Sequence, residues 1–454
     1  MGDANSGEGR RPVFDDAFTI VLAGVRDGTL REDTAYELLE LCERFGLHPP
    51  VLEGALQRLA DIGLARIDPA DLVRFTKLDA VTWAEGSWLL VGLVEVAMRA
   101  LAPVADDADV ARYEELVTAA RRAAAERGDE LDPAVLATVD FWAERTPESF
   151  TGRLLVRTLQ QMRYGLPVRP VWTVTDVESW LASSLQSLRL RQTSSAQRAA
   201  HVFGRLWRRY LEASAPALGV APDALLHPAG AASGDLYWAD WRADDDWFEV
   251  LGSLRDGTLR PGHEYPLRAL TARFRVPLRR LLPMIRRLEV MGLLEAGPDR
   301  DGSVLVTAPT VDEWAETISL LLGLQEMCAR SCMPTLTDDD VEGLRSLLLR
   351  ARREGRVRDY AYTSTLLEIT RFLAVRTPNR AMRQTTTVVI ARLAYILPEP
   401  PTVRQWQVED FLQLIEEAAE ARDPETASEA CHALALHFDA HVVDVHARYG
   451  TMES

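Results

Sequence analysis

The stretch Val250–Gly262, VLGSLRDGTLRPG, decides how the rest of the chain is interpreted. It has an earlier counterpart, Val21–Asp33, which reads VLAGVRDGTLRED and begins 229 residues before it. In both stretches an apolar helical pattern ends at an Asp-Gly pair, which is typical of a turn after a helix. Two such copies indicate that a unit of roughly 230 residues occurs twice in the chain.

The register of this repeat extends well beyond the motif. At the same offset, five residues of the second copy match five of the first: Leu270, Phe274, Ile285, Leu288 and Gly292 fall on Leu41, Phe45, Leu56, Leu59 and Gly63. A longer turn near Asp301-Gly302 then raises the offset to 231 residues. The matches at this offset include Trp314 with Trp83, Arg330 with Arg99, and His432 with His201. One register with a single small gap predicts a tandem duplication.

Composition limits the class of protein. The chain has 454 residues, 47% of them hydrophobic, and a formal net charge of -17, so it can bury several cores and is acidic as a whole. Any surface that binds nucleic acid must therefore be a local basic one. The four cysteines form no CxxC pair, and we expect buried thiols in a reducing, cytoplasmic compartment.

Two segments need an explanation of their own. Residues 1–13 lack an apolar region and predict a short disordered tail. The most apolar stretch, Ser87–Val104, contains Glu95 and Arg99. Two charges in such a stretch favour a buried helix over a membrane span, so no membrane partner is expected.

Periodicity divides the chain into five further segments. Residues 14–75 predict three helices, the second from Thr34 to Phe45, and two short strands, which make a winged helix-turn-helix. Residues 76–212 predict long amphipathic helices and therefore an all-α bundle. Residues 213–243 are rich in Ala, Pro, Gly and Asp and predict a linker. Residues 244–309 and 310–454 repeat the winged helix and the bundle. The predicted fold is mainly α, with small β-hairpin wings.

Several motifs occur in a fixed order in the second copy. They are Asp256–Gly262, the helix LTARFRV from Leu270, the Leu-x-x-x-Gly-Leu pattern from Leu288 to Leu293, a wing glycine at Gly302, and Arg422, Asp423 and Ala427 in the helical half. In this order the chain resembles the GntR superfamily of bacterial regulators, in its FadR-like branch. Proteins of that branch join a winged helix to a six- or seven-helix ligand-sensing domain called FCD. The resemblance covers nearly the whole chain, twice.

The resemblance implies a transcriptional regulator that binds DNA, responds to an unknown small-molecule effector and pairs its subunits around a two-fold axis. A fused tandem copy can supply both protomers, so we expect intramolecular pairing of the two repeats and a possible homodimer. The sequence has neither a Gly-rich phosphate loop nor a nucleophile elbow. We therefore expect that the protein is not an enzyme and that it binds no cofactor.

The two heads differ at the positions that the family uses to read DNA. The resemblance places two arginines at the start of the recognition helix, but the first copy has Pro49 and Glu53 there, and the second has Leu278 and Leu282. The second head nevertheless carries seven arginines: Arg268, Arg273, Arg275, Arg279, Arg280, Arg286 and Arg287. Guanidinium groups suit phosphates and guanine edges, so DNA contact is expected through this head. The alternative is a solvated helix face.

The resemblance also implies a metal site of one Asp and three His inside each bundle. The matching positions are Leu366, Thr370, Leu412 and Leu434 in the second copy, and Val135, Val139, Leu181 and Phe203 in the first. Since none offers a carboxylate or imidazole, we expect no family-type metal site. His437 and His441, with His446 nearby, are a weaker metal candidate or a polar helix face. Arg99 and Arg330 could anchor an acidic ligand, or form ion pairs with Glu95 or Glu326.

Three functions remain open at this stage. The first is a GntR-type transcriptional regulator that works as a single-chain pseudo-dimer. The second is a decayed regulator that acts through protein contacts without sequence-specific DNA binding, which the missing recognition arginines favour. The third is a small-molecule binding protein with vestigial heads.

Overall fold

The computed structural model describes most of the 454 residues. The described ranges are 14–31, 34–61, 64–67, 72–76, 79–126, 130–145, 150–165, 172–226, 245–297, 302–307, 310–359, 361–395 and 408–449. The tail expected at 1–13 lies outside them. By its internal contacts the chain divides into two compact units, Met1–Trp83 with Arg157–Pro167, and Ala84–Val156 with Val168–Ser454.

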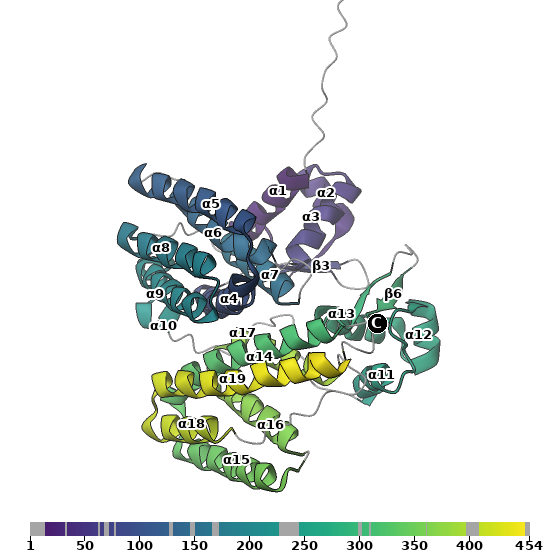
Figure 1. The fold of residues 1–454 in the computed structure, drawn as a ribbon. Coiled ribbons are helices and arrows are strands. Elements are labelled where there is room, and N and C mark those ends of the chain that lie inside the picture. Colours follow the sequence, from purple (N-terminus) through teal and green to yellow (C-terminus); the bar gives the residue numbers. More distant parts are fainter. Residues whose placement is uncertain are drawn as a thin grey trace, which may run out of the picture. The chain divides into compact units, whose positions relative to one another are not determined.

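The first unit contains a small helical domain, here called the first head (Figure 1). Its elements are α1 (Phe14–Arg26), β1 (Ala35–Glu37), α2 (Leu38–Phe45), α3 (Pro49–Asp61), β2 (Ala65–Ile67) and β3 (Leu72–Phe75). The three predicted helices and the hairpin β2–β3 are confirmed. The predicted start of the second helix at Thr34 was wrong, because Ala35–Glu37 form a strand that pairs antiparallel with β3. The sheet order is β1-β3-β2.

Tyr36 explains why this strand forms. Its side chain is buried, with its ring centroid 5.9 Å from that of Phe75, while the flanking Glu37 is exposed. The Tyr36 hydroxyl also accepts a hydrogen bond from the backbone N–H of Arg31 at 2.8 Å. Alternating burial is the period of a strand and not of a helix. The continuous helical interpretation of this segment missed that alternation.

The second unit begins with the first bundle. Its helices are α4 (Ala80–Leu101), η1 (Ala102–Val104), α5 (Asp107–Glu126), α6 (Leu131–Glu144), α7 (Phe150–Gly165), α8 (Val174–Leu190), α9 (Thr193–Leu218) and α10 (Pro222–Leu226). Helices α4 and α7 extend into both units. The predicted linker at 213–243 needs correction in its described part, because α9 continues to Leu218 and α10 follows. Leu225 of α10 is buried, and its carbonyl accepts a hydrogen bond from Trp88 Nε1 at 3.0 Å.

The second head repeats the element order of the first head. Its elements are α11 (Asp245–Arg255), β4 (Glu264–Pro266), α12 (Leu267–Phe274), α13 (Leu278–Val290), β5 (Leu294–Ala296) and β6 (Ser303–Val306). The sheet order, β4-β6-β5, also corresponds to that of the first head. Leu270, Phe274, Ile285 and Leu288, the apolar positions of the predicted repeat, are all buried here.

The second bundle completes this unit. Its helices are α14 (Val311–Cys332), η2 (Met333–Thr335), α15 (Asp338–Val357), α16 (Ala361–Arg376), α17 (Arg380–Tyr395), α18 (Glu409–Ala421) and α19 (Pro424–Tyr449). The long helices α14 and α19 lie side by side (Figure 1). Capping boxes start two helices, with Thr310 and Glu313 at α14 and Thr337 and Asp340 at α15. The protein is thus mostly helical with two small sheets in its described part.

The first helices of the two bundles, α4 and α14, approach each other closely within the second unit. A methyl group built on Gly92 of α4 would overlap Met327 of α14, and one built on Gly323 of α14 would overlap Val96 of α4. At the 231-residue offset, Gly92 matches Gly323 and Val96 matches Met327. The two contacts are therefore equivalent to each other under the repeat.

A second pair of contacts involves two glutamates that match at the 231-residue offset, Glu85 and Glu316. Glu85 of α4 accepts a hydrogen bond from Arg380 N at the start of α17, at 2.8 Å. Glu316 of α14 accepts one from Thr151 N at the start of α7, at 2.7 Å. Each carboxylate thus caps a helix that belongs to the other bundle.

The apolar helix noted in the sequence is α4 with η1. Residues Ala80–Val104 are long and apolar enough to cross a membrane by length and composition alone, but 67% of the apolar window is buried inside the protein. This burial agrees with the predicted core helix. The four cysteines, Cys42, Cys328, Cys332 and Cys431, are free and buried, as expected.

Candidate functional site

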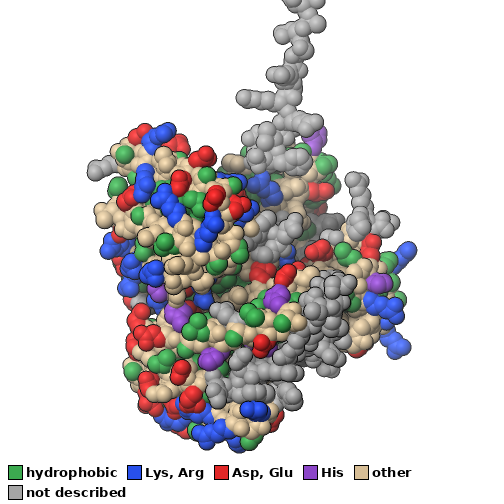
Figure 2. Space-filling model, viewed as in Figure 1, with side chains coloured by type: hydrophobic (Ala, Val, Ile, Leu, Met, Phe, Trp, Pro, Cys, Tyr) green, Lys and Arg blue, Asp and Glu red, His purple; other side chains and the backbone are tan. Residues whose placement is uncertain are grey.

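The predicted DNA-binding arginines lie on one helical pair of the second head. Arg268 and Arg273 on α12, Arg275 in the turn after it, and Arg280 on α13 are all exposed. Figure 2 shows basic side chains gathered over this part of the molecule. Arg279, Arg286 and Arg287 belong to α13, but their side chains lie outside the described part of the structure.

The local fold explains why these arginines face solvent. The apolar residues Leu281, Ile285 and Leu288 of α13 are buried at helical spacing, which leaves Arg280 on the exposed face of the helix. Arg275 ends α12 in the left-handed conformation, with φ of 53°. That conformation reverses the chain between the two helices and leaves the Arg275 side chain exposed.

Leu278 is the exception on this surface. It occupies one of the positions at which the family resemblance implies a base-reading arginine, and it is 46% exposed. A leucine can contact a thymine methyl group but cannot donate hydrogen bonds to bases or phosphates. This position therefore lacks the hydrogen-bond donors that the family resemblance implies there.

The corresponding surface of the first head is acidic. Glu40 and Glu43 on α2 and Glu53 on α3 are exposed. Arg44 is the exposed basic residue that matches Arg273, but its guanidinium pairs with Glu40 at 2.9 Å. Carboxylates on this face repel phosphates, so the two heads differ in charge where a nucleic acid would bind.

The two arginines proposed as ligand anchors have different surroundings. Arg330 on α14 forms an ion pair with Glu425 at 3.5 Å between Nη2 and Oε1, and both side chains are substantially exposed. Its ion-pair partner is thus Glu425 and not the expected Glu95 or Glu326. Arg99 on α4 is half-buried, and its charge acts on Glu95.

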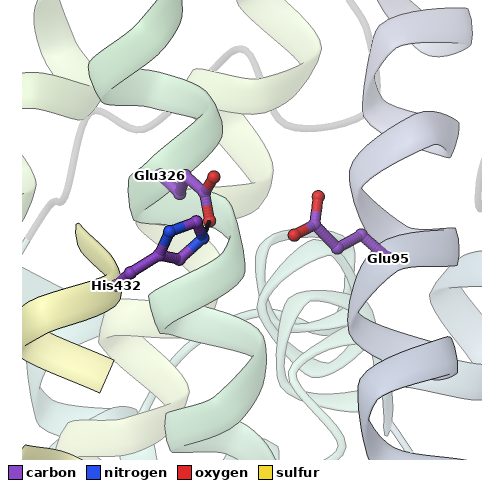
Figure 3. Close-up of side chains that lie close together, drawn as sticks. All are labelled: Glu95, Glu326 and His432. Atoms are coloured by element: carbon purple, nitrogen blue, oxygen red, sulfur yellow. Dashed lines mark ion pairs between the residues drawn. The ribbon is translucent and has the colours of Figure 1, made fainter. Parts of the chain in front are cut away.

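A second cluster of polar side chains lies where α4, α14 and α19 meet. Glu95, Glu326 and His432 each offer one donor atom, and these atoms lie within 4.8 Å of one another. Figure 3 shows Glu95 pointing from α4 toward Glu326 and His432. Glu326 and Glu95 are 3% and 8% exposed, so two carboxylates face each other out of water.

Hydrogen bonds hold one side of this cluster. His432 Nε2 donates to Glu326 Oε2 at 3.0 Å, and the Ser428 hydroxyl donates to the other oxygen at 2.5 Å. Burial opposes the charged form of Glu326, but the bond from His432 keeps the pKa of that carboxyl below its ordinary value. Gln197 Nε2 also contacts the His432 ring, closest to its Nε2 atom and 3.2 Å from Nδ1.

Glu95 is less well supported. Its Oε1 atom is buried and has no hydrogen-bond partner. Burial and, next, the charge of Glu326 raise the pKa of Glu95 to about 7. His201 of α9 interacts electrostatically with both Glu326 and His432, and its Nε2 atom is likewise buried without a partner. The cluster thus contains buried polar atoms with unused bonding capacity.

The positions of the family-type metal site hold core side chains. Seven of the eight are apolar and all eight are buried: Val135, Val139, Leu181 and Phe203 in the first bundle, and Leu366, Thr370, Leu412 and Leu434 in the second. The Thr370 hydroxyl donates to Gln325 Oε1 at 2.8 Å. Of the C-terminal histidines, His441 is buried against the Trp314 ring and His446 lies 3.6 Å from Asp312. His437 forms no cluster with metal-ligating residues in the described structure.

Sequence reasoning missed Glu95, Glu326 and His432 as a cluster, although a signal was present. The repeat aligns Glu95 with Glu326 and His201 with His432 at the same offset. A repeated Glu and a repeated His are unusual survivors between two copies that differ as much as these. That signal becomes meaningful only when α4 and α14 are known to pack against each other.

Comparisons with known structures give several matches of low identity. The chain is similar to McbR/YncC of E. coli, at 16% identity and a TM-score of 0.34 over 45% of this chain and 96% of that one. It is similar to a GntR protein of Streptococcus agalactiae, at 17% identity and a TM-score of 0.25 over 42% and 97%. Lar, which controls the expression of the Listeria monocytogenes agr system, matches at 15% identity and a TM-score of 0.32 over 44% and 95%.

These identities and TM-scores are too low to carry an argument about function. No curated protein matches the chain. Residues 316–437, within the second bundle, match the FCD domain.

Proposed function

We propose that the chain is a DNA-binding transcriptional regulator of the GntR type, built as a single-chain pseudo-dimer that contacts DNA mainly through its second head. The match of residues 316–437 to the FCD domain supports the regulator class. The observation that carries the proposal is the second head itself, a helix-turn-helix with a three-stranded sheet and exposed arginines on both of its helices. Such a surface neutralises phosphates, which is the main source of sequence-independent DNA affinity.

The pseudo-dimer is supported by the equivalent contacts between the bundles. In a two-fold interface, residue i of one protomer touches j of the other, and j of the first touches i of the second. Gly92 with Met327 and Gly323 with Val96 follow this rule under the repeat. The matching glutamates Glu85 and Glu316 each cap the start of a helix in the other bundle, although the N–H donors that they bind lie two positions apart in the repeat register. In this proposal the repeats are the tandem copies at 14–212 and 244–454, and each supplies one protomer.

Divergence then explains the different heads. A symmetric dimer must use the same head twice, whereas a fused chain can change one copy independently. The first head carries Glu40, Glu43 and Glu53 where DNA would approach, and the second carries Arg268, Arg273 and Arg280. We propose that the second head supplies the DNA contact and that the bundles chiefly associate, without the metal-bound acid sensing of the family.

A second candidate function has its own supporting observation. Leu39 on the first head and Leu278 on the second are 66% and 46% exposed, on the helices that would otherwise face DNA. Exposed leucines at such positions suit protein contacts better than nucleic-acid contacts. In this alternative the chain is a decayed regulator that acts through a partner protein.

A mobility-shift assay with fragments of the source genome, repeated at several salt concentrations, separates the two candidates. The full chain is compared with a variant in which Arg268, Arg273 and Arg280 become Ala. We expect weaker retention and a slope of log affinity against log salt that is lower by up to about 2.7, since each lost phosphate contact removes about 0.9. The matched control replaces three exposed arginines of the first bundle, Arg112, Arg121 and Arg189, and has the same net charge.

Two outcomes contradict the proposal. If the full chain retains no DNA even at low salt, direct DNA binding is excluded. If retention falls equally in the triple variant and its control, the second head is not the DNA contact. The mass in solution tests the pseudo-dimer separately. A single chain of 50.6 kDa that binds DNA supports it, whereas DNA binding that requires twice this mass contradicts a self-sufficient chain.

A further inference from the structure

We propose that Glu95, Glu326 and His432 form a site for one divalent transition-metal ion, with Zn²⁺ the best fit, which joins the two bundles at the contact of α4 with α14 and α19. The donor atoms of these residues converge to within 4.8 Å of one another. This site is distinct from the family-type positions, which lie in the interiors of the bundles and hold core side chains. The proposal does not depend on DNA binding.

The chemistry of the donors selects the ion. Two carboxylate oxygens and one imidazole nitrogen are the ligands of many zinc sites, with metal–ligand distances of about 2.0 to 2.2 Å. Ligand atoms on one tetrahedral ion lie roughly 3.3 Å apart, so the side chains need to close by roughly 1 to 1.5 Å. Torsions of two glutamates supply such a movement without a change in the helices. Ca²⁺ and Mg²⁺ prefer all-oxygen sites with more ligands than this cluster offers.

The electrostatics of the cluster call for a cation. Two buried carboxylates that face each other cannot both be ionised cheaply without a positive charge between them. The Arg330 guanidinium on the second bundle forms its ion pair with Glu425, and its charge acts on Glu95 and Glu326 without contacting either carboxylate. Arg99 is half-buried and lies on the same helix as Glu95, one turn further along. An ion between Glu95 and Glu326 would balance both acids at once.

An unused buried atom points to the ligand independently. Glu95 is 8% exposed, and its Oε1 atom has no hydrogen-bond partner although its carboxylate is directed at Glu326 and His432 (Figure 3). A buried carboxylate oxygen that is left unsatisfied destabilises the fold, and metal coordination would remove that cost. Outside the cluster, the Ser428 hydroxyl holds Glu326 in place, as outer residues of metal sites commonly do.

His201 is the position from which a fourth ligand could come. It matches His432 in the repeat, its Nε2 atom is buried without a partner, and it interacts electrostatically with Glu326 and His432. With it, the site would contain one Glu and one His from each copy. A pseudo-two-fold site of this kind would couple metal occupancy to the pairing of the bundles.

The test measures Zn²⁺ binding to the full chain after treatment with a chelator. Isothermal titration is expected to give one equivalent of Zn²⁺ per chain, and thermal unfolding is expected to shift upward with Zn²⁺ concentration as mass action requires. Glu95→Gln and His432→Gln should each weaken binding by about 100-fold or more, because each removes a ligand. His446→Gln, on the same helix as His432 but outside the cluster, is the matched control and should bind as the wild type does.

X-ray absorption of the zinc-loaded wild type provides a readout that does not require a variant to fold. We expect nitrogen and oxygen ligands with an imidazole contribution. Sulfur ligands would place the ion at the cysteines and overturn the proposal. The proposal is also overturned if the wild type binds no Zn²⁺, in which case a proton shared by Glu95 and Glu326 occupies the place of the metal, or if both cluster variants bind as tightly as the control.

Discussion

Glu85 and Arg380 lie 295 residues apart in sequence, yet the Glu85 carboxylate accepts a hydrogen bond from the Arg380 backbone N–H at 2.8 Å. Asn379, the residue before, donates its side-chain amide to the Glu85 carbonyl at 3.0 Å. The carboxylate and the backbone carbonyl of Glu85 thus both accept hydrogen bonds from the start of α17. Glu316 holds the start of α7 through Phe150 N and Thr151 N. Two acids of one repeated position therefore each cap a helix of the opposite bundle.

The first prediction concerns these caps. Glu85→Ala and Glu316→Ala should each lower the free energy of unfolding by about 1 to 2 kcal/mol, because each exposes helix N–H groups that lose a charged acceptor. Urea denaturation followed by circular dichroism measures the change. Glu342→Ala, which removes an exposed carboxylate paired with Arg345, is the control and should change stability by less than about 0.5 kcal/mol. Equal effects at all three positions would show that these caps have no special role.

The second prediction concerns the close approach of α4 and α14. Gly92→Val and Gly323→Val should each destabilise the protein by about 1 to 3 kcal/mol, because the new side chain overlaps Met327 or Val96 of the facing helix. Gly204→Ala in α9 is the control, since its nearest neighbour would lie 3.5 Å from the new methyl group, an ordinary contact. Alanine there should stabilise by about 0.5 to 1 kcal/mol through helix propensity. Valine tolerated at both glycines would contradict the observed packing.

The third prediction concerns Arg392, which attaches the second head to the second bundle. This arginine of α17 is 1% exposed, and its Nη1 donates to the carbonyls of Met291 and Gly292 at the end of α13. Arg392→Met preserves much of the volume but removes the guanidinium donor from both carbonyls, of which that of Gly292 keeps the Thr307 hydroxyl at 3.0 Å. We expect a loss of about 2 to 4 kcal/mol and faster proteolysis after α13. Arg383→Met, on the same helix, is the control. Unchanged proteolysis of the head would mean that other contacts hold it.

The sequence predicted the heads and bundles because both depend on local patterns. The helices of the first bundle follow from apolar spacing, and the hairpin β2–β3 follows from alternation over a few residues. The strand β1 was missed because three residues carry too weak a signal, and its pairing with β3 is non-local. The helical part of the predicted linker was missed because Pro216 and Gly219 lowered the helix signal, although Gly219 only ends α9.

The candidate sites were harder to predict, for a different reason. Arg268, Arg273 and Arg280 were found because a basic cluster in an acidic chain is visible without a fold. Glu95, Glu326 and His432 come from three helices, and the repeat that aligns Glu95 with Glu326 does not by itself bring them together. Their proximity depends on how α4 packs against α14, which is set by Gly92 and Gly323. A site between two repeats can therefore be predicted only when the packing of the repeats is known, even where the repeat itself is evident from the sequence.

The fourth prediction concerns the pH dependence of the α15 capping box. The side-chain hydrogen bond from Thr337, its backbone N–H and the Arg376 guanidinium together hold the pKa of Asp340 at about 2, below its ordinary value of 3.8. Because the folded-state pKa is the lower one, the charged carboxylate stabilises the fold. This stabilisation is fully present above about pH 5 and is lost as the pH falls from 4 toward 2.

Asp340→Asn isolates this effect in a pair of urea titrations between pH 3 and 7. Near neutral pH the variant should be less stable by about 1 kcal/mol, the usual cost of a lost cap, and the difference from wild type should shrink as the pH falls below 4. Asp339→Asn, at the exposed neighbouring position, is the matched control for charge. A difference that stays constant down to pH 3 would mean that Asp340 acts through its shape and not through its charge. If the stability difference between Asp340→Asn and wild type disappears in acid, the stabilisation comes from the charged carboxylate that Thr337 and Arg376 hold.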